Sequence, residues 1–139
     1  MGEVIEVRTS GRCQLVDITA EVQRILSAWG PVDGAALVYV PHTTAGVTIN
    51  ENADPSVAAD ILDHLEKLVP RERGYRHREG NADAHIKATL TGFSQLVPVR
   101  EGRLELGTWQ GIFLCEFDGP RTRRVLVDFL PSRPRSGGG

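Results

Sequence analysis

Short strand-like segments separated by turns dominate this sequence, and they constrain its fold more than any other feature. From residue 94 onwards the chain reads SQLVPV, RLELG, WQGIFLCEF and RRVLVDFL, with turns at Glu101-Gly102 and DGPR. Earlier, EVIEVRTS, CQLVDIT, GAALVYVPH and AGVTINEN carry the alternation or the β-branched residues typical of strands. We expect the first two to be joined by a turn at Gly11, because strands in series with short turns are typical of antiparallel hairpins.

Two segments have the apolar spacing of a long helix. The first, DITAEVQRILSAWGP, has Thr19 as its predicted N-cap. In the second, DPSVAADILDHLEKLVP, Asp54 is the predicted cap and Pro55 takes the first helical position. The predicted buried stripe of the second helix is Val57, Ile61, Leu62, Leu65 and Leu68.

A shorter helix, ADAHIKATLTG, is expected to turn Ile86 and Leu90 inward. Two main helices among many strands indicate an α+β domain with an antiparallel or mixed β-sandwich-like core, and they argue against a doubly wound parallel sheet. We predict a single domain over residues 1–130. The segment 131–139, rich in Pro, Gly, Ser and Arg, is predicted to be a disordered tail.

Composition excludes several classes of function. The chain has 139 residues and a net charge of −2, which gives no electrostatic case for a nucleic-acid partner. It has no signal-peptide pattern and no apolar run long enough to cross a membrane. Its two cysteines, Cys13 and Cys115, do not make a disulfide scaffold, and free thiols favour a cytoplasmic location. No glycine-rich phosphate loop precedes either helix.

Polar residues that secondary structure does not require gather in four segments, PHTTAGVTINEN, YRHREGNADAH, LGTWQG and CEFDGPRTRR. His42, His77 and His85 lie in these segments, whereas His64 is off the apolar stripe of its helix and is expected at the surface. A neutral imidazole binds zinc and also acts as an acid or base near neutral pH. Because no spacing matches a known zinc motif, a hydrogen-bonding role in a corner stays open for each histidine.

The other polar residues also have two interpretations. Asp83 is suited to capping the short helix, and Trp109, flanked by glycines, is suited either to the core or to the wall of a pocket for a flat ligand. A charged turn follows DGP, and its side chains fit either a phosphate site or a solvated hairpin end. The basic residues of that turn are Arg121, Arg123 and Arg124.

Together HTTAGVTINENADPSV, YRHREGNADAHIKATLTG, VPV and GRLELGTWQGIFLCEFDGPRTRRV resemble the YjbQ family of secondary thiamine-phosphate synthase enzymes. The resemblance covers the chain from the first strands to Val127. It implies a small α+β homotrimer with pockets near the subunit boundaries. It also implies an activity that joins a hydroxymethylpyrimidine diphosphate to a thiazole phosphate and releases pyrophosphate, although "secondary" indicates a different physiological substrate.

The resemblance supplies the candidate site residues. Its catalytic candidates are His42, His77, His85 and Glu116. Its substrate-binding candidates are Thr43, Asn50, Asn52, Asn81, Trp109, Gln110 and Arg121. We further hypothesise that the site is assembled between subunits, with His42 contributed from one side and His77 and His85 from the other.

The chemistry leaves the cofactor and the class of function open. Mg²⁺ bound with a diphosphate prefers oxygen ligands, and the candidates for it are Glu51, Asp54, Asp83 and Glu116. A centre of His42, His77 and His85 suits zinc instead. The expected partner is a small phosphorylated or anionic ligand. The alternatives to a synthase are a metal-dependent hydrolase of a small anionic substrate and a non-catalytic trimer that binds a metal or ligand.

Overall fold

The computed structural model describes residues 2–133. The strands of this part of the chain are β1 (Glu3–Arg8), β2 (Gln14–Asp17), β3 (Gly34–Tyr39), β4 (Ala45–Glu51), β5 (Ser94–Arg100), β6 (Arg103–Leu104), β7 (Gln110–Glu116) and β8 (Thr122–Pro131). The helices are α1 (Thr19–Ala28), α2 (Pro55–Leu68) and α3 (Ala82–Thr91). The predicted α+β class is confirmed.

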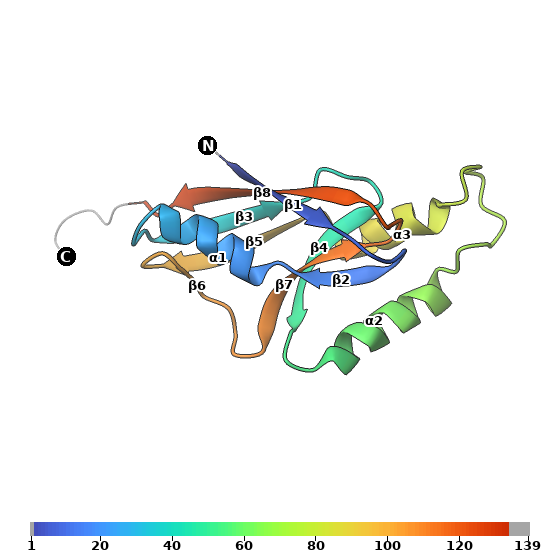
Figure 1. The fold of residues 1–139 in the computed structure, drawn as a ribbon, viewed down its shortest axis with the longest axis horizontal. Coiled ribbons are helices and arrows are strands. Elements are labelled where there is room, and N and C mark those ends of the chain that lie inside the picture. Colours follow the sequence, from blue (N-terminus) through green and yellow to red (C-terminus); the bar gives the residue numbers. More distant parts are fainter. Residues whose placement is uncertain (1, 134–139) are drawn as a thin grey trace.

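The strands form two antiparallel sheets. One has the order β1-β8-β3-β5-β6 and the other the order β2-β7-β4. Val38, Val47, Leu114 and Val127 lie in the main core, and Val22 and Leu26 of α1 complete it. Figure 1 shows α2 and α3 toward the end of the molecule away from α1.

Three of the connections in which the chain passes from one sheet to the other are residues 9–13, 40–44 and 117–121. We call these three connections the switch corner. Backbone hydrogen bonds hold them together, because Thr9 N donates to Arg121 O at 2.9 Å and Phe117 N donates to Thr44 O at 3.2 Å. Polar backbone groups that leave a sheet must find such partners when they are buried.

The hairpin expected between the first two strands is absent. β1 pairs with β8, whereas β2 pairs with β7 in the other sheet. The turn signal at Gly11 marked the end of a strand correctly, but a bend of the same composition also serves to carry the chain to another sheet. Local sequence therefore identified the strands and missed their partners.

The helices confirm some predictions and correct others. Asp54 caps α2, with its Oδ1 accepting from Ser56 N at 2.9 Å, and Pro55 is the first helical residue. In α1 the predicted cap is wrong. Thr19 is already helical, and the side chain of Asp17 accepts from Thr19 N at 2.9 Å. A carboxylate two residues earlier thus takes the capping role that the hydroxyl was expected to play.

The predicted inward face of α2 is largely confirmed, whereas that of α3 is wrong. In α2, Val57, Ile61, Leu62 and Leu65 are half-buried, and only Leu68 of the predicted stripe is exposed, at 56%. In α3, Ile86 and Leu90 face outward, and the buried face contains Ala84 and Ala88. Small residues suit this position because α3 lies directly against β4.

The ends of the described chain refine the domain boundary. β8 extends to Pro131, and Ser132 N donates to Asp33 O at 2.9 Å, so ordered structure passes the boundary predicted at residue 130. The rest of the predicted tail, residues 134–139, lies outside the described residues. Among the helices of residues 2–133, none has the length and apolar character needed to cross a membrane.

Candidate functional site

At the strand ends that border the switch corner, Glu116 of β7 and Arg123 of β8 form a buried ion pair, and they are 0% and 2% exposed. Arg123 Nε donates to both carboxylate oxygens, at 2.9 and 3.0 Å, and its Nη2 donates to Thr44 Oγ1 at 2.8 Å. Thr9 Oγ1 and Asp118 N complete the set around Glu116, at 2.8 and 3.0 Å. Burial raises the pKa of Glu116, but these hydrogen bonds outweigh it and hold the pKa below its ordinary value.

This geometry gives Glu116 a structural role, and its predicted catalytic role stays a prediction. Both of its oxygens are occupied by protein donors, and the side chain has no access to solvent. A general acid or base must reach the proton that it transfers. Glu116 instead neutralises Arg123 and fixes the point where β7 leaves its sheet.

His42 lies at the edge of this network and is held as a neutral ring. Its Nε2 accepts from Arg124 N at 2.9 Å, which places the ring proton on Nδ1. Burial and the positive charge of Arg123 lower the pKa of His42. The ring lines a cavity of about 440 Å³, together with Tyr39, Val40, Pro41, Thr43 and Phe93. In this state His42 offers a ligand a donor at Nδ1.

A second buried charge network holds α3. Asp83 is 0% exposed and accepts from Arg12 through two nitrogens, at 3.1 and 3.0 Å, and from Lys87 Nζ at 2.9 Å. Lys87 also reaches Glu66 on α2 at 2.5 Å. Although burial raises the pKa of Asp83, the hydrogen bonds from Arg12 and Lys87 lower it to about 2. Asp83 therefore anchors the helix as the acceptor for two cations, and its predicted capping role is wrong.

Asn81, directly before α3, binds that end of the helix to the switch corner. Its Nδ2 donates to Asp118 Oδ2 at 2.8 Å, and the same oxygen accepts from Arg121 Nη2 at 3.2 Å. Arg121 Nε also donates to the backbone of Asp118 at 2.8 Å. Because Arg121 and Arg123 both have protein acceptors, the turn after DGP is not a free arginine cluster. The arginines that stand out in this part of the sequence hydrogen-bond within the corner and hold it together.

His77 and His85 are brought together. Their ring centroids lie 5.2 Å apart at an interplanar angle of 79°, and His77 Nε2 is 3.7 Å from Glu79 Oε2. Among residues 2–133, no group of three or more His, Cys, Asp or Glu side chains is placed to hold a metal ion. The centre predicted from His42, His77 and His85 therefore stays a prediction that needs more than one chain.

Four substrate-binding candidates lie at the opposite end of the strand pair β4–β7, namely Asn50, Asn52, Trp109 and Gln110. Ala45 pairs with Glu116 at the corner, and Glu51 pairs with Gln110 at the far end. Six residue steps along a strand span roughly 20 Å. At the far end Asn52 N donates to Trp109 O at 2.9 Å, and the Trp109 side chain is 63% exposed.

The sequence interpretation missed Arg12 and Lys87. Lys87 follows Asp83 by four residues, and an acidic residue four positions before a lysine is a recognised helix pair. That pattern was visible, but it did not show that the pair is buried. Arg12 has no comparable local signal, because its partner Asp83 is 71 residues away. Of the cysteines, Cys115 is buried, and burial raises the pKa of its thiol to about 12.

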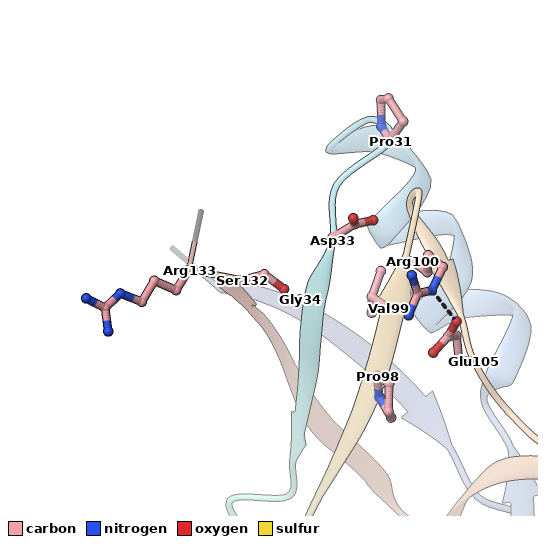
Figure 2. Close-up of a pocket in the computed structure, with 9 residues that line it drawn as sticks. All are labelled: Pro31, Asp33, Gly34, Pro98, Val99, Arg100, Glu105, Ser132 and Arg133. Atoms are coloured by element: carbon pink, nitrogen blue, oxygen red, sulfur yellow. Dashed lines mark hydrogen bonds and ion pairs between the residues drawn. The ribbon is translucent and has the colours of Figure 1, made fainter. Parts of the chain in front are cut away.

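A larger cavity, of about 570 Å³, contains none of the predicted site residues. Its lining is Pro31, Asp33, Gly34, Pro98, Val99, Arg100, Glu105, Ser132 and Arg133. Figure 2 shows the Arg100–Glu105 ion pair, at 2.8 Å, on one side and Arg133 pointing away on the other. Arg100 and Glu105 thus pair with each other, and Asp33 accepts from Glu101 N at 2.7 Å. We do not place the functional site there.

The fold and the corner define a class of protein, a small α+β domain whose polar motifs occupy the connections between two antiparallel sheets. The family model described as "UPF0047 protein YjbQ-like" matches residues 3–132. The chain therefore belongs to the YjbQ/UPF0047 family, as the sequence motifs indicated.

Relatives and solved structures agree with this assignment. UPF0047 protein MJ1081 of Methanocaldococcus jannaschii is 51% identical over 125 residues, covering 90% of this chain and 91% of that protein. UPF0047 protein YugU of Bacillus subtilis is 50% identical over 131 residues, covering 94% and 99%. A YjbQ/UPF0047 family crystal structure from Clostridium acetobutylicum has a TM-score of 0.90 at 51% identity, covering 92% and 99%. A YbjQ-like protein from Sulfolobus solfataricus also gives 0.90, at 38% identity, covering 95% and 97%.

Proposed function

We propose that this protein is a small cytoplasmic enzyme that acts on a phosphorylated or otherwise anionic small molecule, with thiamine-phosphate synthase as a secondary activity. The observation that carries the proposal is the contact between His77 and His85 at 5.2 Å. His85 belongs to α3, a helix held by the buried Asp83–Lys87 pair, whereas His77 is accessible on the preceding loop. Accessible acid–base groups on a rigidly held element are the arrangement that catalysis requires.

In the synthase reaction the thiazole nitrogen forms a bond to the methylene carbon of the pyrimidine. The bond between that carbon and the diphosphate oxygen breaks, and pyrophosphate leaves with the electron pair. The barrier falls when donors stabilise the charge that develops on the leaving oxygen. We assign that task to His77 and His85, while His42 donates from Nδ1 to the bound substrate.

The carboxylates predicted for Mg²⁺ do not form a metal centre in one chain. Glu116 and Asp83 are each committed to cationic side chains. Glu51 accepts from Ala53 N and Asp54 caps α2, both at the far end of β4. We derive no catalytic step through a metal from this donor set.

We further propose that the enzyme is a homotrimer whose subunits meet through the outer face of the five-stranded sheet. Val4 and Tyr39 both pair with Leu126, and Leu37 pairs with Leu96, so these side chains share the face opposite the core. Val4, Tyr39 and Leu96 are 46%, 44% and 60% exposed. Strands apolar on both faces are typical of sheets that are covered on both sides. If the Leu96→Glu variant has the same molecular mass in solution as the wild-type protein, the proposed interface is wrong.

A trimer also accounts for the separation of the candidate residues. The histidine pair belongs to α3 and its preceding loop, which Asn81 and Asp83 bind to the switch corner. Trp109 and Asn52 lie at the far end of β4–β7, about 20 Å along the strands from that corner. We propose that the Trp109 end of one subunit completes the histidine site of its neighbour. The exposed indole would then stack on a flat ring of the substrate.

The second candidate function is metal-dependent hydrolysis of a small anion. A related alternative is a trimer that binds the metal without catalysing a reaction. Both are favoured by the His77–His85 contact, because two neighbouring imidazoles supply half of a tetrahedral zinc site. Metal analysis of the purified protein separates the two candidates. Stoichiometric zinc that is lost in His77→Ala and His85→Ala would support the hydrolase, and a metal-free protein that makes thiamine phosphate would contradict it.

The synthase proposal is tested by measuring thiamine phosphate formed from the two phosphorylated precursors. We expect His85→Ala to lower turnover by a factor of about 10² or more. His64→Ala is the matched control, because His64 is an exposed histidine on α2. If the wild-type protein forms no product, or if His85→Ala equals His64→Ala, the proposal fails.

A further inference from the structure

We infer that the loop of residues 71–80 holds a binding pocket for the phosphate or diphosphate group of a small molecule. The pocket has a volume of about 220 Å³ and is lined by Arg71, Glu72, Arg73, Gly74, Tyr75, His77, Arg78, Gly80 and Ala82. The inference rests on the proposed function, since it assigns the phosphate of that substrate to this pocket.

Charge is the first argument for the pocket. Residues 71–80 contain four arginines and two glutamates, a net charge of +2, although the whole chain carries −2. The residues that line the pocket include three arginines and one glutamate, Glu72. A concave surface with an excess of one charge concentrates ions of the opposite charge. The loop is thus a positive region on an otherwise acidic protein.

Availability is the second argument. Arg73 and Arg78 are exposed, and neither has an ion-pair partner in the described part of the chain. Arg71 makes one long contact, from Nε to Gly80 O at 3.4 Å. Arg123 beside the switch corner, by contrast, is buried on a carboxylate. The guanidinium forks of the loop are therefore free to bind phosphate oxygens.

The position of the pocket links it to the histidine pair. Tyr75 Oη donates to Pro70 O at 2.5 Å, which ties the loop to the end of α2. His77 lines the pocket, and its ring contacts His85 on α3. A diphosphate bound by the arginines would therefore lie beside the two imidazoles, where the proposed reaction needs donors for the leaving group.

The test is calorimetric titration of the full-length protein with inorganic pyrophosphate in the absence of other substrates. We expect the double variant Arg73→Gln/Arg78→Gln to bind about tenfold or more weakly, because two charged hydrogen-bond donors are removed. Arg24→Gln/Arg103→Gln is the matched control, since it removes the same charge from two exposed arginines elsewhere. The inference is overturned if the wild-type protein does not bind pyrophosphate, or if both double variants bind equally well.

Turnover separates this inference from the proposed function. Pyrophosphate binding that depends on Arg73 and Arg78, in a protein that forms no thiamine phosphate, would support the pocket and refute the synthase. Turnover that persists when both arginines are replaced, with pyrophosphate binding unchanged, would support the synthase and refute the pocket.

Discussion

The two ends of the strand pair β4–β7 carry polar motifs of similar appearance, yet the structure treats them in opposite ways. At the corner end, Glu116 and Thr44 are buried, and both are hydrogen-bonded to Arg123. At the far end, Trp109 is 63% exposed, and Asn50 and Asn52 also face solvent. One end is closed by its own chain, and the other is open to a partner or ligand.

This comparison shows that an acidic residue within a polar sequence motif can be buried and paired rather than available for catalysis. Three connections change sheets at the corner, and their polar groups need partners once they are buried. Glu116 and Asp83 are two of the partners that these buried groups use. The groups that stay accessible for chemistry are the ring of His77 and the arginines of the loop 71–80.

The largest expected effect comes from opening the closed end. Arg123→Met leaves the carboxylate of Glu116 buried without its cation, and removing one partner of a buried ion pair costs about 3–5 kcal/mol. Urea unfolding monitored by circular dichroism measures this loss of free energy. A loss below about 1 kcal/mol would show that the corner tolerates an unpaired Glu116 and would remove the contrast between the two ends.

The packing of α3 on β4 predicts the next largest effect. A Cβ added at Gly46 would lie 2.3 Å from Thr91 Oγ1 and 2.5 Å from Gly92 O. Gly46→Ala must therefore displace the end of α3, and we expect a cost of about 1–3 kcal/mol. Gly11→Ala is the control, because its nearest neighbour would be 3.7 Å away. Equal stabilities of the two variants in urea would contradict the tight contact.

The anchoring of α3 predicts a dependence on pH. Because the folded pKa of Asp83 is about 2, below the value near 4 of an unfolded aspartate, its contribution is fully present above pH 4. That contribution is lost as the pH falls from about 4 towards 2. Asp83→Asn should make the free energy of unfolding less dependent on pH in this window. An unchanged slope between pH 4 and pH 2 would show that Asp83 is not the anchor.

The smallest effect on stability is expected at the open end. Trp109→Ala removes a mostly exposed side chain, and we expect the free energy of unfolding to change by no more than about 0.5 kcal/mol. Turnover should fall nevertheless, because the indole is proposed to contact the substrate. Full turnover in the folded Trp109→Ala variant would remove this residue from the site.

Local signals predicted the elements of the fold well. Asp54 followed by Pro55 is a strong helix start, and α2 begins there as expected. The alternation in AGVTINEN matched β4, Ala45–Glu51. These predictions hold because capping and alternation depend on residues a few positions apart. The partner of each strand depends on distant residues, and for this reason the hairpin expected at Gly11 was wrong.

The site was harder to predict because the sequence pattern did not show which of its residues are buried. Ile86 and Leu90 appeared to mark the inward face of α3, whereas Ala84, Ala88 and the neutralised Lys87 are buried there. Helical periodicity locates an apolar stripe, but close packing favours small residues, and a buried lysine needs partners from other elements. Sequence motifs found the polar segments, and only the fold showed which of their residues are free.

The most direct test of the central claim is a complementation measurement of thiamine-phosphate turnover. His85→Ala and Trp109→Ala chains, each with its own affinity tag, are co-expressed, and the mixed trimers are purified. If the corner of one subunit and the open end of its neighbour form one site, each mixed trimer regains about one of its three sites, because only one interface joins an intact His85 to an intact Trp109. Activity well above that of either single variant is the predicted result. Mixed trimers no more active than the single variants would contradict the shared site.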